Sequence, residues 1–334
     1  MKLKLIALAA VLAASGLANA GVDSGAASGD GTFLASVAYG NAAAGSSASF
    51  DLGLSFSQVA TWQADINTTL AGGATEWYRS WNLSTGVYSG TGLTAAAVGT
   101  YSSILADFNA AAATAGATST AQLQVMALDG LGTTVGSRGI YASGNAIHAT
   151  TGAALAVAAS TNTVNNGLAG GSTVVGFFNN VNVSGTHATD VNGAHLASAG
   201  SAAYFNNGSG MEKVANTGMF DTNGQYNGQY AAGSTTFAGQ QQGVAFFNQV
   251  SSSLTGSAKA KLTAIGYDID MDGVIEFDNN GASLGGTEYG LWTLQGDVLK
   301  FSVTAVPEPE SYAMLLAGLG LMGAIARRRN NKGA

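Results

Sequence analysis

The sequence contains no cysteine, only two prolines and few charged side chains. Without cysteine, the chain has neither disulfide bonds nor thiolate ligands for a metal ion. Charged residues make up 9% of the chain, against about 25% in an average globular protein. The formal net charge is −7, which excludes the broad basic surface that nucleic-acid binding requires.

Glycine is abundant instead, at 48 of 334 residues, beside a hydrophobic share of 46%. That hydrophobic share is sufficient to bury a core, so the composition predicts a folded body. No Asp, Glu, Lys or Arg occurs between Gly139 and Thr189, where hydroxyl, amide and backbone groups must cover the surface. Such a surface is typical of secreted matrix or cell-surface proteins. We find no convincing acid–base pair and expect no enzymatic activity.

Residues 1–20 contain the three parts of a secretory signal peptide in order. Two lysines precede an apolar stretch over residues 5–14, and Ala18 and Ala20 form a small-x-small cleavage site. The apolar stretch is shorter than the ~20 residues that a membrane span needs. We therefore expect cleavage after Ala20 and a secreted body over residues 21–306.

Residues 307–334 combine a Pro-Glu-Pro motif, an apolar run over residues 312–326 and a closing arginine cluster. The motif and cluster residues are Pro307, Glu308, Pro309, Arg327, Arg328 and Arg329. The apolar run predicts a single transmembrane helix, and the adjacent arginines keep its end on the cytoplasmic side. At about 15 residues the run is short for a ~30 Å hydrocarbon core, which favours a temporary anchor.

This order of features resembles the PEP-CTERM sorting tail. The added Glu310 departs from the pattern but leaves the order intact. The resemblance implies that the chain is a substrate of exosortase, a membrane peptidase that cuts near the Pro-Glu-Pro motif. It also implies a Gram-negative bacterium that makes exopolysaccharide. The expected route is export across the inner membrane, transient anchoring there, and a final location at the cell surface or outside the cell.

Alternation with period two predicts antiparallel strands at three places in the body. Apolar and polar residues alternate over residues 50–56, 123–127 and 299–305, while residues 101–115 are the clearest helix candidate. We predict a mostly β, antiparallel β-sandwich-like extracellular body with one or two short helices, in addition to the C-terminal transmembrane helix. Whether this body forms one domain or two, with a boundary near residues 139–171, stays open.

Two seven-residue stretches of the body are almost identical. Residues 175–181 read VGFFNNV and residues 244–250 read VAFFNQV. The similarity ends immediately outside these stretches, so it does not indicate a repeat array.

An acidic stretch over residues 268–279 resembles an EF-hand-type calcium loop. Oxygen ligands at alternate positions would come from Asp268, Asp270, Asp272, Val274 through its carbonyl group, Glu276 and Asp278. Gly273 occupies the sharp turn, but position 12 of the loop is Asn279 instead of the usual Glu. The alternative is a β-hairpin that turns at residues 272–273. That hairpin would set like charges opposite each other, which a cation would relieve. We expect a structural Ca²⁺ here.

Two further clusters have competing interpretations. Trp77, Tyr78 and Trp81 are either a stacking platform for sugar rings or, more commonly, core residues. His187 and His195 are spaced for metal ligation together with Asp190, although a solvated or hydrogen-bonded pair is favoured, and a third histidine lies at position 148.

These features favour an exported, non-catalytic structural or adhesive protein that is processed by exosortase and associated with exopolysaccharide or biofilm. The alternative is a secreted carbohydrate-binding or glycan-active protein. A groove with two carboxylates about 5 to 9.5 Å apart would favour the glycan-active alternative. The expected partners are exosortase, the inner membrane and exopolysaccharide, without nucleic acid.

Overall fold

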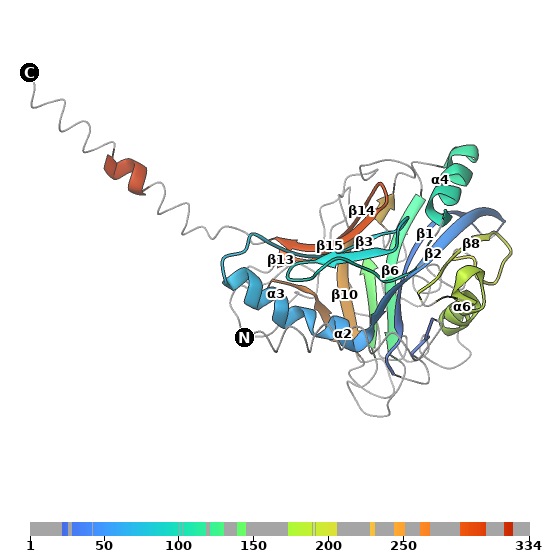
Figure 1. The fold of residues 1–334 in the computed structure, drawn as a ribbon, viewed down its shortest axis with the longest axis horizontal. Helices are drawn as coiled ribbons and strands as arrows, with labels where there is room; N and C mark the ends of the chain where they lie inside the picture. Colours follow the sequence, from blue (N-terminus) through green and yellow to red (C-terminus); the bar gives the residue numbers. More distant parts are fainter. Residues whose placement is uncertain are drawn as a thin grey trace, which may run out of the picture.

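The computed structural model shows a curved β-sheet with a few short helices around it (Figure 1). The structure describes residues 22–25, 29–41, 43–99, 101, 103–117, 121–129, 139–144, 173–188, 190, 192–205, 228–230, 244–250, 261–267, 288–304 and 317–322. The signal-peptide segment and residues 305–316 and 323–334 of the tail lie outside this part of the chain.

Within the described residues, thirteen strands form one sheet and two form a separate small sheet. The large sheet consists of β1 (Thr32–Asn41), β2 (Ala44–Ser55), β3 (Glu76–Asn82), β4 (Val87–Gly90), β5 (Ala96–Ala97), β6 (Ala121–Asp129), β7 (Gly139–Gly144), β8 (Ala194–Ser198), β9 (Gly228–Tyr230), β10 (Val244–Val250), β11 (Lys261–Ala264), β14 (Leu291–Gln295) and β15 (Val298–Thr304). The small sheet pairs β12 (Gly266–Tyr267) with β13 (Glu288–Tyr289).

The strand order of the large sheet is β5-β4-β3-β15-β14-β10-β7-β6-β1-β2-β8, and β9 and β11 pair with β6 and β10 off this path. The pairs in the sheet are antiparallel, as in the β1–β2 hairpin and the β3–β15 pair. Strands from both sides of residues 145–172 therefore share one sheet, since β3 lies beside β15 and β7 lies beside β10.

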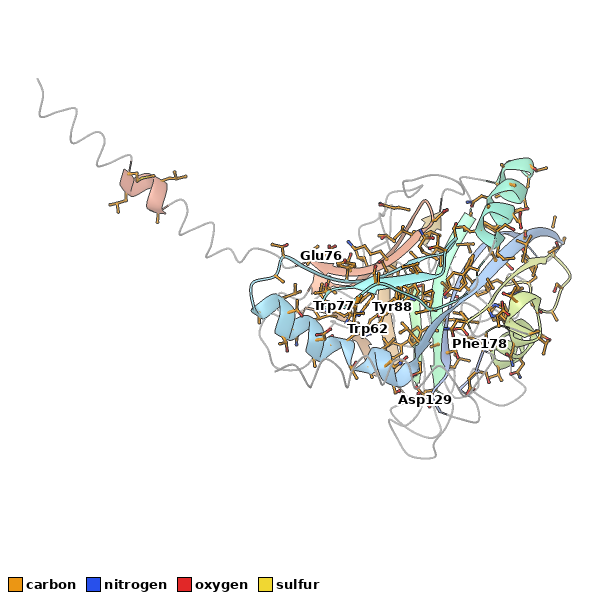
Figure 2. The ribbon with its side chains drawn as sticks, viewed as in Figure 1. Trp62, Glu76, Trp77, Tyr88, Asp129 and Phe178 are labelled. Carbon is orange, nitrogen blue, oxygen red and sulfur yellow. The ribbon has the colours of Figure 1, made fainter. Side chains whose placement is uncertain are left out.

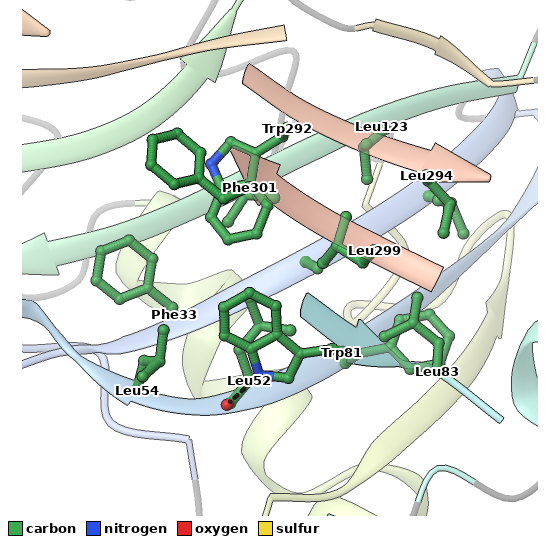
Figure 3. Packing of buried hydrophobic residues seen from close by; sticks show 14 of the residues in the cluster. Phe33, Leu52, Leu54, Trp81, Leu83, Leu123, Trp292, Leu294, Leu299 and Phe301 are labelled. Atoms are coloured by element: carbon green, nitrogen blue, oxygen red, sulfur yellow. Dashed lines mark hydrogen bonds between the residues drawn. The ribbon is translucent and has the colours of Figure 1, made fainter. Parts of the chain in front are cut away.

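The sheet curves so that its two halves face each other across one core. The indole Nε1 of Trp81 on β3 donates a hydrogen bond to the carbonyl oxygen of Leu52 on β2 at 2.9 Å, as Figure 3 shows. Phe301 on β15 and Phe33 on β1 belong to the same buried cluster. The inward residues of the strands alternate with outward ones, as expected for strands with one face in the core. The facing halves give the body its two layers.

The helices are α2 (Phe56–Ala60), α3 (Trp62–Ala71), α4 (Ile104–Thr114), α6 (Thr173–Asn182) and the 3₁₀ helix η1 (Gly185–Ala188). On α3, Trp62, Ile66 and Leu70 are buried at a four-residue spacing, which places one face of the helix on the core. Figure 2 shows Trp62 beside Trp77 between α3 and the sheet, with 5.4 Å between the ring centroids.

The predicted fold class is confirmed in its main terms, because the described residues are mostly β, antiparallel and poor in helix. The three predicted strands correspond to β2, β6 and β15, and the predicted helix corresponds to α4. Strand β2 ends at Ser55 and Phe56 opens α2, so the last residue of the predicted 50–56 stretch is helical.

A second buried region lies on the opposite face of β1, β2 and β6. It is covered by α6, η1 and residues 199–205, and we call these segments together with the adjoining edge strand β8 the outer layer. Its aromatic centre is Phe177, Phe178 and Phe205, with 5.2 Å between the ring centroids of Phe177 and Phe205. Figure 2 places Phe178 on this side of the sheet. Tyr204 ties the layer to β1 by donating its hydroxyl proton to the carbonyl oxygen of Tyr39 at 2.8 Å.

Residues 317–322 of the tail are helical, and Leu319, Leu321 and Met322 are exposed. Among the described residues, no helix has the length and apolar character needed to cross a membrane. The rest of the predicted span over residues 312–326 lies outside them.

Candidate functional site: two buried histidines in a polar row

A row of polar side chains crosses the outer-layer face of the sheet. The strand register sets Gln124 opposite Ser36, Ser36 opposite Ser49, and Ser49 opposite His195. All four are at most 2% exposed. The hydroxyl oxygens of Ser36 and Ser49 are 2.8 Å apart and hydrogen-bonded. A buried sheet face is usually apolar, so this row is the most unusual feature of the described interior.

His187 of η1 lies next to His195 of β8, with ring centroids 5.4 Å apart at 63°. Nε2 of His187 is 3.3 Å from the carbonyl oxygen of Ser49, and Nε2 of His195 is 3.1 Å from that of Ala203. A carbonyl oxygen can only accept a hydrogen bond, so each Nε2 must carry the proton. Each neutral ring therefore keeps a free lone pair on Nδ1.

Within the described part of the chain, neither Nδ1 atom has a hydrogen-bond partner, and the amide oxygen and nitrogen of Gln124 also lack one. Burial lowers the pKa of His187 to about 3, and the neighbouring His195 adds to this effect, while the Ser49 carbonyl opposes it. Burial also lowers the pKa of His195. The site therefore holds two neutral bases whose proton-accepting atoms face no donor among the described residues.

Close backbone contacts fix both rings. A Cβ at Gly185 would lie 2.6 Å from the Cβ of His195, and one at Gly193 would lie 2.4 Å from the backbone nitrogen of His187. The hydroxyl of Thr186 donates to the carbonyl oxygen of Ala194 at 3.0 Å and accepts from its backbone N–H at 2.8 Å. Any other residue at the two glycines would push η1 away from β8.

Asp51 adds a buried carboxyl group on the same face of β2. Its Oδ1 accepts a hydrogen bond from the backbone N–H of Gly53 at 2.8 Å. Burial raises the pKa of Asp51 to about 7, and the hydrogen bond from Gly53 opposes the rise. Burial, and then the charge of Asp51, raise the pKa of Tyr101, whose hydroxyl donates to the Asp51 carbonyl oxygen. This carboxyl group is therefore partly protonated near neutral pH.

The structure brings together the predicted histidine pair, but the described residues supply it with no third ligand. Asp190 follows η1, and this part of the chain contains no group of three or more His, Cys, Asp or Glu arranged to hold a metal ion. His148 lies outside the described residues. The favoured prediction of a hydrogen-bonded pair agrees with the geometry, although both rings are buried and neither is solvated.

The predicted calcium ligands lie outside the described residues, so the loop stays a prediction. These ligands are Asp268, Asp270, Asp272, Val274, Glu276 and Asp278. The two ends of their segment are described: Tyr267 of β12 pairs with Glu288 of β13, and the backbone N–H of Gly290 donates to the carbonyl oxygen of Ile265 at 2.7 Å.

Trp77 and Trp81 cannot form the stacking platform for sugar rings that was one of the two predictions, because both are fully buried in the core. Period-two alternation on β3 turns both indoles inward. Of the three predicted platform residues, Tyr78 alone lies on the solvent side. The core interpretation of the two tryptophans therefore agrees with the structure, and a sugar ring cannot reach them.

Sequence reasoning missed an ion pair beside these tryptophans, between the buried Arg79 and the exposed Asp65. Arg79 lies on the same inward face of β3, with its guanidinium carbon 4.1 Å from the ring centroid of Trp77. Its Nη2 is 2.7 Å from Oδ2 of Asp65, which also accepts a hydrogen bond from the Trp77 indole. The alternation of Trp77, Arg79 and Trp81 was a usable signal for this position. The polar row gave no such signal, because serines alternating with apolar residues indicate a solvent face.

The comparisons with known proteins add the sorting class of the chain. Residues 305–330 match the family of the PEP-CTERM protein-sorting motif. The protein is thus an exported protein that carries a PEP-CTERM tail, which implies transient membrane anchoring and processing by exosortase. The predicted resemblance is confirmed. No curated protein and no solved structure matched the chain.

Proposed function

We propose that the protein is a non-catalytic cell-surface or matrix protein of a Gram-negative bacterium that exosortase processes and that then associates with exopolysaccharide. The observation that carries this proposal is the position of the sorting motif. It begins at residue 305, directly after β15 ends at Thr304.

A cut near the motif would leave the folded body complete. Strand β15 lies between β3 and β14, and its Phe301 and Val303 are fully buried. Of the residues that follow Thr304, the structure describes 317–322, which are helical. Processing near the motif would therefore leave every described strand of the sheet in the released body.

The test of sorting uses the full chain in a Gram-negative host with exosortase and in the same host without it. We expect the extracellular protein to end near Pro307 by intact mass only when exosortase is present. Glu308→Ala, within the motif, should leave the chain in the membrane fraction. Glu310→Ala, at the added residue, is the matched control and should be processed normally. Equal processing of all samples would reject the proposal.

The solvent face of β4, β3, β15 and β14 supports association with a polysaccharide. Several of its side chains carry hydroxyl groups, and one register row contains Ser89, Ser80, Lys300 and Thr293. The Nζ atom of Lys300 is 2.6 Å from Oε1 of Glu76, so these two charges compensate each other.

Tyr78 lies next to this row and offers the only aromatic ring among the described residues of these strands that face solvent. The Nζ atom of Lys300 is 4.9 Å from its ring centroid, a cation–π contact that holds the ring in place. A neutral polysaccharide fits this surface, because hydroxyl groups can pair with its hydroxyls and the ring can pack on a sugar face.

Affinity electrophoresis of the processed protein in gels that contain neutral or acidic polysaccharides tests this association. We expect retardation by a neutral polysaccharide, a roughly threefold to tenfold weaker interaction for Tyr78→Ala, and recovery of the polysaccharide uncut. Leu196→Ala is the control, because Leu196 is 40% exposed on β8, at the other end of the strand order. Equal retardation of both variants would reject this surface, and shortened polysaccharide would favour a glycan-active protein.

A further inference from the structure

We propose that the two buried histidines make the outer layer an acid-operated gate, which opens from β2 when the pair takes up protons. This inference goes beyond the proposed function and does not depend on it. It rests on the geometry of the pair and on the charges around it.

The closed site, as far as the described residues form it, has no place for a second proton on either ring. Both Nε2 atoms already donate to carbonyl oxygens of Ser49 and Ala203. A proton on Nδ1 of His187 or His195 would create a buried cation whose new N–H faces no acceptor among these residues. In the open layer, water would solvate both imidazolium rings. Protons therefore bind the open form more strongly than the closed form.

The described surroundings offer no compensating negative charge in contact with the rings. Helix α6 and η1 carry no Asp, Glu, Lys or Arg. The titratable groups on the described elements packed around the pair are Asp51 on β2, Tyr39 on β1, Tyr101 and Asp107 on or before α4, Asp190 after η1, and Tyr204 of the outer layer. None of these side chains hydrogen-bonds to either imidazole ring, because both Nδ1 atoms are unpartnered and both Nε2 atoms face backbone carbonyls.

Asp51 has the opposite response to acid. Because burial holds its pKa at about 7, lowering the pH removes a charge that this buried position disfavours. Acid therefore stabilises β2 at Asp51 while it destabilises the contact between β2 and the histidines. Because Asp51 lies on the face of β2 that the outer layer covers, its protonation favours the closed layer and offsets the effect of one of the two histidines.

The gate has a defined direction and steepness. An exposed imidazole has a pKa near 6.5, whereas burial places that of His187 at about 3. Below pH ~6.5, each histidine raises the open population up to about tenfold per pH unit. Opening also exposes Asp51, which loses its proton in the open form at pH values between about 4 and 7, so the net rise is up to about tenfold per pH unit. Opening would uncover Phe177, Phe178 and Phe205 and free the edge of β2 that β8 now occupies.

Hydrogen exchange of the full chain between pH 7.5 and 4.5, corrected for the intrinsic exchange rate, tests the gate. We expect peptides from residues 173–205 to lose protection first, while peptides from β3 and β15 keep theirs. The decisive variant is His187→Gln with His195→Gln. Glutamine keeps an N–H donor for each carbonyl oxygen but cannot take up a proton. This variant should keep its protection at low pH.

His148→Gln is the matched control and should open like the wild type. The proposal is overturned if the outer layer loses protection no earlier than β3, or if the double variant responds to acid like the wild type. Because the double variant could fail to fold, a second measurement uses the unaltered protein. In NMR titrations of the histidine ring carbons, two of the three histidines should stay neutral well below pH 6 in the closed form. Titration of all three near pH 6.5 would equally overturn the proposal.

Discussion

At the scale of single residues, the interior departs from an apolar core at a small number of places. Arg79 pairs with Asp65 beside Trp77, and the polar row with its two histidines lies on the other face of the sheet. The inward position of Arg79 could have been predicted from its alternation with two tryptophans. The sequence did not indicate the row, because Ser36 and Ser49 follow the pattern of solvent-facing residues. Only the outer layer, which comes from a distant part of the chain, buries them.

Asp51 provides a prediction at this scale. Its pKa of about 7 in the folded state, against about 4 in the unfolded chain, means that the folded state holds the extra proton between these values. Its contribution to stability therefore falls as the pH rises from about 4 to 7 and is lost above 7. Asp51→Asn keeps an oxygen acceptor for Gly53 and does not titrate. We expect the advantage of Asn over Asp to grow from pH 5 to 7 and to level off by pH 8.

Urea unfolding of both proteins at pH 5, 6, 7 and 8 measures this difference. The gain should approach about 1.4 kcal/mol per pH unit below pH 7. Because the histidine pair is present in both proteins, its own pH dependence cancels in the comparison. A difference that is the same at all four pH values would show that the Asp51 carboxylate is not disfavoured by burial.

At the scale of the elements, local sequence and final structure disagree most clearly in the two similar stretches. Residues 175–181 lie in helix α6, whereas residues 244–250 form strand β10 in the sheet. In α6, Val175, Phe178 and Val181 recur at a three-residue spacing and are buried on one face. In β10, the backbone pairs with β7 and β14 on its two sides. Tertiary partners, not local preference, decide between helix and strand here.

Where period-two alternation coincided with one buried face, as in β2 and β15, the strands were predictable. Helix α3 was missed because its three buried residues, Trp62, Ile66 and Leu70, are separated by polar ones and give a weak pattern. The outer layer was missed for a different reason. The sheet face beneath it carries serine and histidine, so nothing in those strands indicated that the outer layer covers them.

Two glycines in the outer layer give a matched prediction. Gly176 lies inside α6, and a Cβ added there would have no neighbouring atom of the described residues within 4 Å, so Gly176→Ala should stabilise the protein by about 0.5–1 kcal/mol. Gly185 has a φ of +56°, and a Cβ there would meet β8 at 2.6 Å. Gly185→Ala should therefore destabilise the layer. Hydrogen exchange of residues 173–205 distinguishes them, and equal effects of both substitutions would contradict the packing of η1 on β8.

At the scale of the whole molecule, the segments before and after the predicted calcium loop are attached to the main core. Tyr267 pairs with Glu288, and a Cβ at Gly290 would lie 1.9 Å from the ring of Phe301, so this connection is packed directly against the sheet. An ion in the loop would therefore stabilise the folded body as a whole, by mass action. The sorting tail supports this role indirectly, because an exported protein meets calcium at levels that suit weak sites.

Thermal unfolding of the full chain with calcium and with a chelator tests this coupling. We expect calcium to raise the unfolding midpoint of the wild type, by about 2.7 kcal/mol of stability when calcium is at a hundredfold excess over its dissociation constant. Asp270→Ala with Asp272→Ala should abolish the calcium response, whereas Asp107→Ala on α4 should retain it. If calcium leaves every curve unchanged, the hairpin alternative would account for the acidic stretch. If calcium shifts all variants equally, the ion binds elsewhere in the body.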